Sequence, residues 1–319
     1  MQATPDPSIV RIDGPWAHRD VSANGILLHV AELGDGPLVV LLHGFAEFWW
    51  TWHHQLVALA DAGFRAVAVD LRGYGDSDKP PRGYDAWTLA GDVGGLIKAL
   101  GARKAHLAGH AWGGMLAWSV AALHPRLVSS VTAIGAAHPL ALRSAVSRMA
   151  WLRRGSQTRA LGHLFRFQVP MAPERKLVED NAVAVEDLFR AWAGPAWRES
   201  ADFRDSARTF RQAMLVPGVA HSALEYYRWA FRAQFRGEGR RFTDAVGSRI
   251  TAPVLQLHGE ADTCILPDTA RASVRWAGPH SAPRIWPGVG HFPQLEAPER
   301  TSDALVEFLK TPANQASSK

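Results

Sequence analysis

Residues 106–118, HLAGHAWGGMLAW, combine the end of an apolar strand, a glycine-rich turn and the start of a helix. Ala111 is at the centre of the turn, with Gly109, Gly113 and Gly114 around it. A side chain in such a sharp turn is held in strained backbone geometry that only small neighbours permit. It points away from the sheet, toward the N–H groups that begin the helix. This is where a nucleophile is displayed, but alanine has no attacking group. The plainer alternative is a helix start whose glycines serve only close packing.

Apolar runs and helical segments alternate on both sides of this turn. Short continuous apolar runs, typical of strands buried on both faces of a parallel sheet, occur at 37–45, 65–70, 128–135 and 252–262. A further strand is expected within PRIWPGVGHF at 283–292. Strands that alternate with helices of about 10 to 15 residues are typical of a doubly wound, mostly parallel sheet.

The section from 138 to 246 breaks this alternation. It is rich in arginine, tryptophan and phenylalanine, has a mostly helical pattern and shows no buried-strand run. We therefore expect an α/β fold in three parts: a first core segment at 1–137, a helical lid at 138–246, and a second core segment at 247–319. The last residues, TPANQASSK, have the composition of a disordered tail.

The composition is that of an ordinary globular enzyme. The chain has 319 residues, 47% of them hydrophobic and 20% charged, with a net charge of +5. Its lysines and arginines form no long run, so neither nucleic acid nor a membrane is an expected partner. The single Cys264 excludes an internal disulfide and fits a reducing compartment. With no secretory-signal pattern and no apolar run of ~18 residues, we expect a soluble cytoplasmic protein.

No cofactor is expected from the sequence. The histidines lack carboxylate or cysteine partners at the spacing of metal ligands. Neither a phosphate loop nor a dinucleotide fingerprint is found. The oligomeric state cannot be derived from the sequence.

Two residues near the C-terminus could assist chemistry at the turn. Asp262 follows one predicted buried strand, and His291 follows the next. An open α/β sheet builds its site on loops beyond the carboxyl ends of its strands, and the order of nucleophile, acid and histidine is the order used with such a turn. His291 is the candidate general base, which Asp262 would orient. If the two side chains did not touch, a binding module without chemistry would be favoured.

Backbone N–H groups near the turn could form an oxyanion hole. His43-Gly44 follows a predicted strand, so the chain can turn sharply and direct the N–H of Phe45 toward the N–H of Trp112. Two such donors would stabilise negative charge on a reacting oxygen, and removal of one typically costs ~2.7 to 4 kcal/mol of barrier.

Several motifs together resemble the α/β-hydrolase superfamily, and specifically its epoxide hydrolase-like branch. The resemblance spans roughly residues 16–310, and related dehalogenases share the same architecture. It rests on HGFAEFWWTW (43–52), DLRGYGDSDKP (70–80), GHAWGG (109–114), GEAD (259–262) and GVGHFPQLEAPE (288–299). The resemblance implies that Ala111 stands at the family's aspartate nucleophile, with His291 as base, Asp262 as acid, and Phe45 and Trp112 as oxyanion donors.

The lid carries further implied positions. Epoxide hydrolases use lid tyrosines to donate a hydrogen bond to the ring oxygen, and SALEYYRW (222–229) assigns that role to Tyr226. His163, in HLFRFQVP, stands where the other tyrosine is expected, and Ala46 replaces the usual proline. Many lid aromatics indicate a bulky, apolar, epoxide-like ligand: Trp151, Phe165, Phe167, Trp192, Trp197, Phe203 and Trp229.

The missing nucleophile leaves several interpretations of the function open. In the family, a carboxylate attacks the epoxide carbon and the resulting ester is hydrolysed by water that the histidine activates; Ala111 cannot perform the first step. The chain is then either a hydrolase disabled at residue 111 and nearly inactive, or a natural non-hydrolytic member. The latter would bind an apolar ligand or use His291 and Asp262 as a general base. A dehalogenase-like hydrolase is a further alternative.

Overall fold

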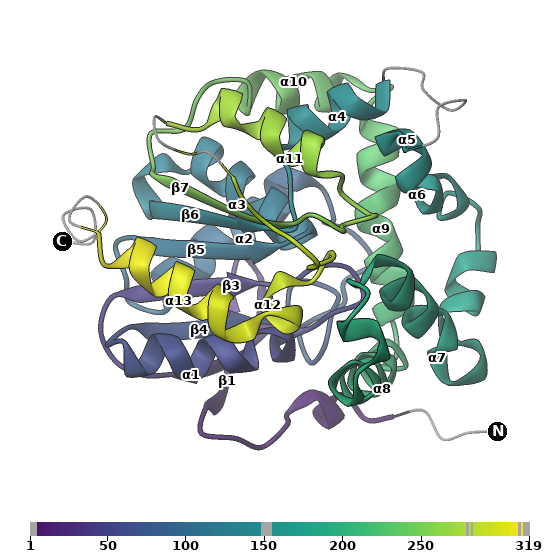
Figure 1. The fold of residues 1–319 in the computed structure, drawn as a ribbon, viewed down its shortest axis with the longest axis horizontal. Helices are drawn as coiled ribbons and strands as arrows, with labels where there is room; N and C mark the ends of the chain where they lie inside the picture. The colour runs from purple at the N-terminus through teal and green to yellow at the C-terminus, as the bar shows by residue number, and fades with distance from the viewer. Residues whose placement is uncertain (1–4, 148–154, 279–280, 282, 312–313, 315–319) are drawn as a thin grey trace.

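The computed structural model of the protein describes residues 5–147, 155–278, 281, 283–311 and 314. Its centre is an eight-stranded sheet (Figure 1) with the strand order β1-β2-β4-β3-β5-β6-β7-β8. Only the pairs β1/β2 and β2/β4 are antiparallel, so the prediction of a mostly parallel sheet is confirmed. The strands are β1 (Ala17–Ala23), β2 (Ile26–Leu33), β3 (Leu38–Leu42), β4 (Arg65–Val69), β5 (Ala105–His110), β6 (Val128–Ile134), β7 (Val254–Gly259) and β8 (Arg284–Trp286).

Helices cover both faces of the sheet. In Figure 1, α1 and α13 lie in front of the strands, and α2 and α3 lie behind them. The core helices are α1 (His53–Asp61), α2 (Ala86–Ala99), α3 (Trp112–Leu123), α11 (Pro267–Ala272), α12 (Pro293–Glu296) and α13 (Pro298–Leu309). Short 3-10 helices are η1 (Pro7–Val10), η2 (Trp49–Trp52), η3 (Pro125–Leu127), η4 (Trp197–Glu199) and η5 (Ser273–Trp276). Every residue of β3, β5, β6 and β7 is buried, as strands covered on both faces require.

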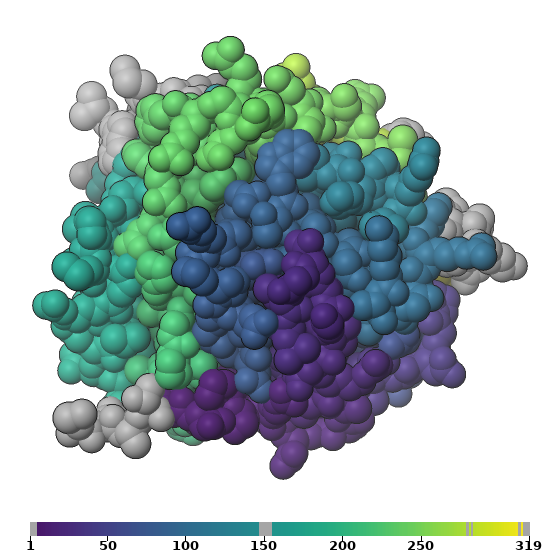
Figure 2. Space-filling view, turned by 180° about the vertical axis from the view of Figure 1, so that it is seen from behind, coloured from purple at the N-terminus to yellow at the C-terminus, as the bar shows by residue number. Residues whose placement is uncertain are grey.

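In the described residues between β6 and β7, seven α-helices and the short 3-10 helix η4 form the lid. The α-helices are α4 (Pro139–Ser147), α5 (Gln157–Ala160), α6 (Gly162–Arg166), α7 (Ala172–Trp192), α8 (Ala201–Met214), α9 (Val219–Ala233) and α10 (Gly237–Ala245). Helices α5 to α9 stand beyond one end of the strands in Figure 1, at the edge where β5 ends in the turn at Ala111. Figure 2, from behind, shows the green and teal lid packed along one side of the core.

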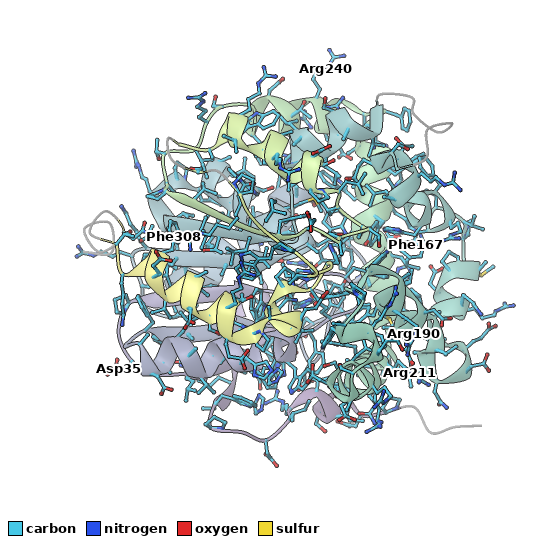
Figure 3. All side chains as sticks on the ribbon, in the orientation of Figure 1. Asp35, Phe167, Arg190, Arg211, Arg240 and Phe308 are labelled. Carbon is cyan, nitrogen blue, oxygen red and sulfur yellow. The ribbon has the colours of Figure 1, made fainter. Side chains whose placement is uncertain are left out.

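The lid has its own packing. Glu186 of α7 accepts from Arg190 on the same helix at 3.2 Å and from Arg211 of α8 at 2.9 Å, which ties the two helices together. Figure 3 labels Arg190 and Arg211 in this part of the lid. Helix α7 is interrupted near its middle, where Asp180, Asn181 and Ala182 have positive φ. The predicted lid residue Trp151 lies outside the described residues. Of the predicted C-terminal tail, only Thr311 and Asn314 are described.

No helix in the described part of the chain combines the length and apolar character needed to cross a membrane.

Candidate active site

The turn between β5 and α3 has the strained geometry that the glycine pattern predicts. Ala111 has φ 47° and ψ −111°, a conformation that L side chains rarely adopt and that costs about 1 to 3 kcal/mol. Close packing requires the glycines around it. A Cβ at Gly109 would collide with the Gly113 carbonyl, and one at Gly113 would collide with the Leu42 carbonyl. The turn is therefore fixed by backbone packing and does not depend on the side chain at residue 111.

Two backbone N–H groups flank Ala111. Trp112 begins α3, and Phe45 follows the turn after β3; within the described residues neither N–H donates to a protein acceptor. The Cα of Gly44 lies beside Ala111, because a Cβ built on Gly44 would be 3.0 Å from the Ala111 Cβ. Phe45, Ala111 and Trp112 line one cavity together with His291. This arrangement brings together the expected oxyanion donors and the expected nucleophile position.

The side chains of His291 and Asp262 form a buried pair. His291 Nδ1 is 2.8 Å from Asp262 Oδ2, and the two side chains are 3% and 0% exposed. Asp262 Oδ1 also accepts from the backbone N–H groups of Cys264 and Ile265, at 2.7 and 2.9 Å. Burial alone would raise the pKa of Asp262, but His291 and the other donors hold it below its ordinary value. The acid and base predicted from chain order are thus in contact, which argues against a module without chemistry.

His258 contacts the same carboxylate, and sequence reasoning did not find it. Its Nε2 is 2.7 Å from the carbonyl of Ile265 and 3.2 Å from Asp262 Oδ2. Because burial lowers the pKa of His258, its ring stays neutral and Nε2 acts as the donor. His258 therefore helps to hold Asp262 in place.

A second buried histidine–carboxylate pair lies beside the first. His110 Nδ1 is 2.7 Å from Glu47 Oε2, and His110 Nε2 is 2.7 Å from the carbonyl of His291. Both ring nitrogens face acceptors, so both must donate and the ring is an imidazolium. Burial alone would lower the pKa of His110, but Glu47 raises it above the ordinary value. Glu47 also accepts from the N–H of Gly44 at 2.6 Å. This ion pair joins the loops that carry Phe45, Ala111 and His291.

The sequence analysis missed this pair because its partners are 63 positions apart. Both residues stand inside quoted motifs, Glu47 in HGFAEFWWTW and His110 in GHAWGG. Their place in these motifs was the only indication in the sequence, and it does not predict that the two side chains pair.

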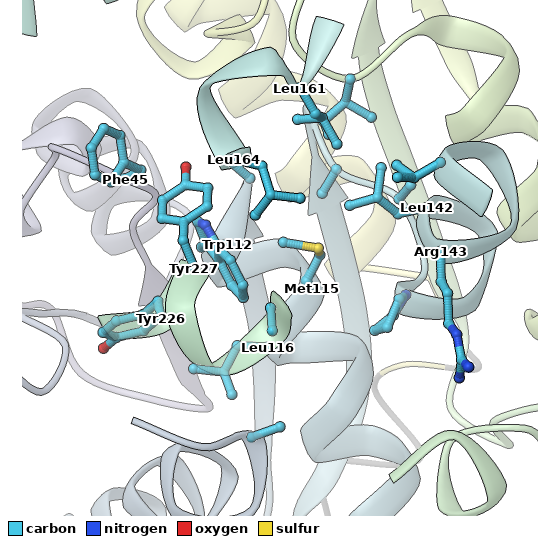
Figure 4. Close-up of a pocket in the computed structure, with 18 of the residues that line it drawn as sticks. Phe45, Trp112, Met115, Leu116, Leu142, Arg143, Leu161, Leu164, Tyr226 and Tyr227 are labelled. Carbon is cyan, nitrogen blue, oxygen red and sulfur yellow. The ribbon is translucent and has the colours of Figure 1, made fainter. Parts of the chain in front are cut away.

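The two adjacent lid tyrosines point in different directions. Tyr226, the predicted donor to the ligand, donates its hydroxyl to the backbone carbonyl of Arg72 at 2.7 Å. The ring of Tyr227 packs edge-on against Phe45 and Trp112, with centroids 5.1 and 5.2 Å away. Figure 4 shows the two hydroxyls on opposite sides, that of Tyr227 toward Phe45 and Leu164. One step along a helix rotates a side chain by about 100°. The hydroxyl predicted for the ligand is therefore engaged elsewhere, and Tyr227 stands in the expected place.

His163 lines the cavity at the lid side. Its ring packs against the rings of Trp192 and Tyr227, at centroid distances of 5.1 and 5.6 Å. Burial, with smaller effects of Arg166 and His291, lowers its pKa to about 3, so the ring is neutral at ordinary pH. Its Nε2 has no hydrogen-bond partner among the described residues.

The cavity between the core and the lid holds about 190 Å³ of water-accessible space and has mostly apolar walls. Of the lid aromatics singled out in the sequence, Trp192 and Trp229 line its wall. Trp197 and Phe203 belong to the core of the lid, where their rings are in contact. In Figure 4, Met115 of α3 lies across from Leu164 of the lid. No group of three or more metal-ligating side chains is found in the described parts of the chain.

Ala46, which replaces the proline usual in the resembling family, has φ 61°. Proline fixes φ near −65°, so it could not occupy residue 46 in the backbone conformation found here. The loop between β3 and α1 is built for a residue with positive φ.

Comparison with known proteins agrees with this geometry. The profile of the family described as "alpha/beta hydrolase fold" matches residues 37–298. Epoxide hydrolase A of Mycobacterium tuberculosis (strain ATCC 25618 / H37Rv) is 32% identical over 93% of this chain and 98% of its own length. AB hydrolase superfamily protein YfhM of Bacillus subtilis (strain 168) is 32% identical over 91% of this chain and 96% of its own. The crystal structure of epoxide hydrolase A from Mycobacterium thermoresistibile matches with a TM-score of 0.76 and 29% identity, covering 92% of this chain and 98% of the other. The chain therefore belongs to the α/β-hydrolase family, and its homologues include epoxide hydrolases.

Proposed function

We propose that the protein binds an apolar small molecule through a polar oxygen and does not hydrolyse epoxides by the covalent ester route. One observation carries the proposal: Ala111 occupies the strained turn and lines the cavity beside two N–H donors that have no acceptor among the described residues. A methyl group cannot attack an epoxide carbon, so no ester can form for His291 to hydrolyse. Removal of such a nucleophile typically costs several powers of ten in rate.

Tyr227 takes the donor role first expected of Tyr226. Its ring packs on Phe45 and Trp112, the residues whose N–H groups form the oxyanion hole. Tyr226 already donates to the Arg72 carbonyl, and a ligand could use its hydroxyl only by breaking that bond. The oxygen of an epoxide or carbonyl ligand would thus lie between Tyr227 and the turn.

Two departures favour a natural non-hydrolytic member over a disabled hydrolase. His163 replaces a tyrosine, and Ala46, with φ 61°, stands where proline is usual. Loss of a nucleophile at residue 111 alone would account for neither. The same missing carboxylate argues against dehalogenation, because displacement of a halide also needs an attacking group.

The test is the substitution Ala111→Asp, assayed with styrene oxide. We expect the unmodified chain to form no diol above the buffer rate, and A111D to exceed it by about 10³-fold or more. Ala111→Asn is the matched control, because it has nearly the size of aspartate without its nucleophilic carboxylate, and it should stay at the buffer rate. Diol formation by the unmodified chain as fast as by A111D would overturn the proposal.

A second candidate function is general-base chemistry without a covalent intermediate. The specific observation in its favour is the 2.8 Å contact between His291 and the ionised Asp262, which a simple binding protein does not need. Its signature would be deuterium uptake from D₂O at the acidic carbon of a bound aryl ketone such as phenylacetone. The uptake should be lost in His291→Gln; uptake equal to the buffer rate in the unmodified chain excludes this proton transfer.

A further inference from the structure

Replacement of a carboxylate by a methyl group leaves hydrogen-bond donors at the turn with no acceptor. The N–H groups of Phe45 and Trp112 have no protein acceptor within the described residues. Trp112 also opens the 12-residue helix α3, whose N-terminus favours negative charge. Family members have their own aspartate here, but this chain presents the donors to whatever enters the cavity.

His291 supplies a second, independent feature. Its side chain is only 3% exposed, it lines the same cavity, and Nδ1 is engaged by Asp262. No described residue of the chain hydrogen-bonds to Nε2. The buried imidazole therefore has one nitrogen available to a ligand that also touches Ala111.

We propose that this site binds carboxylic acids with an apolar body, and that the ligand carboxylate occupies the space of the missing aspartate side chain. One oxygen accepts from the N–H groups of Phe45 and Trp112, and the other accepts from His291 Nε2. The apolar body extends along Met115 and under Tyr227. The inference deepens the proposed function, since it rests on the same cavity and names its ligand class.

The charges around the site suit a carboxylate once His291 Nε2 carries a proton. An Nε2–H group donates to the ligand oxygen, whereas a lone pair on Nε2 would repel it. The order is then ligand carboxylate, imidazolium and Asp262 carboxylate, in which opposite charges alternate. The other titratable groups that face His291 are His110, His163, His258 and Glu296.

The cavity has one competing anion site at its other end. Arg143 of α4 is the only lysine, arginine, aspartate or glutamate among the described residues that line it. Figure 4 shows Arg143 across the cavity from Phe45. Arg143 is exposed, so an ion pair there would be solvated and weak. Substitutions at Arg143 and at residue 111 therefore distinguish the two positions.

The experiment compares 3-phenylpropionate with its neutral analogue, 3-phenylpropionamide. Binding is measured by isothermal titration calorimetry. We expect the acid to bind about tenfold or more tightly than the amide, because only the acid carries the charge that the N–H donors and His291 favour.

Variants at residue 111 provide the matched control. Ala111→Asp should weaken binding of the acid by about 100-fold or more, because two carboxylates cannot share the site. Ala111→Asn fills the same space without charge, so it should hinder acid and amide alike. The amide should bind A111D and A111N equally well within a few-fold.

The outcomes separate this inference from the proposed function. Equal binding of acid and amide would overturn the inference and leave an apolar ligand site standing. Loss of acid binding in Arg143→Ala with none in A111D would overturn it by moving the carboxylate to the other end. Binding of neither compound, nor of styrene oxide, would overturn the proposed function as well.

Discussion

The two sides of the cavity differ in how the sequence determines them. On the core side, Ala111 and Asp262 follow the buried strands β5 and β7, and the structure brings them together with His291. His291 follows β8, which was expected to be buried but is a partly exposed edge strand. On the lid side, the donor expected at Tyr226 is engaged by Arg72, and the neighbouring Tyr227 faces the turn. Residues after parallel strands converge at one edge whatever the details of each loop. The direction of a side chain on a helix depends on its position around the helix axis. If the residue is assigned one position too early, its side chain points away from the cavity.

The largest effect should come from the core side, in the A111D background. Changing His291 to Gln there should lower diol formation from styrene oxide by about 10²- to 10⁴-fold, since the general base is lost. The ester would then form without being hydrolysed, so the protein mass should increase by the mass of one styrene oxide. Intact-protein mass spectrometry measures this; fast turnover without any adduct would show that the core side does not work as the family resemblance implies.

Proline at residue 46, in the loop after β3, should destabilise the protein. Ala46→Pro forces φ from 61° to about −65°, and we expect it to lower the free energy of unfolding by ~3 kcal/mol. Ala46→Gly is the control, because glycine tolerates positive φ; it should leave stability unchanged or raise it by up to ~1 kcal/mol. Urea titrations measure both. Full stability of A46P would mean that this loop adopts the proline-compatible path, which would remove one difference from the family.

The tyrosine pair provides a direct test of helix phase. In the A111D background, Tyr227→Phe should slow styrene oxide opening by about 10²-fold, as loss of one donor to a developing oxyanion does. Tyr226→Phe should change the rate only a few-fold and instead lower the free energy of unfolding by ~1 to 2 kcal/mol, because it leaves the Arg72 carbonyl without its partner. Steady-state rates and unfolding curves of both variants decide the assignment; reversed results would return the role to Tyr226.

The smallest effect concerns acid stability and His163. The folded protein keeps this ring neutral down to pH about 3, but the unfolded chain takes up its proton near pH 6.5. Stability therefore falls as the pH drops below 6.5, by ~2 kcal/mol at pH 5 for this group. His163→Phe should not show this loss of stability, because phenylalanine takes up no proton. Unfolding free energies at pH 7.5 and 5 measure it, with the exposed His221→Phe as control; equal acid sensitivity of H163F and the unmodified chain would contradict the buried neutral ring.

The fold was predictable because parallel strands buried on both faces leave an unmistakable apolar signature. β3 consists of apolar residues alone, and β5 and β7 are mostly apolar, with a few polar residues that hydrogen-bond inside the core. The acid and base of the site followed from the same regularity. Glu47 and His110 were not predictable, since their pairing depends on how two loops meet in space. The positive φ of Ala46 was not predictable either, because alanine, unlike glycine, does not indicate a positive φ in the sequence.

The backbone at Ala111 has an evolutionary consequence. Since glycine packing against the Leu42 carbonyl and neighbouring backbone fixes the turn, an aspartate there would meet a backbone already shaped for it. Two of the four alanine codons become aspartate codons by a single base change at the second position. Under the proposed function, a chain that retains ligands and one that converts them would then differ by one point mutation, with no rearrangement of the turn. The strain that the chain keeps at this turn would preserve that route in a protein that is not selected as a catalyst.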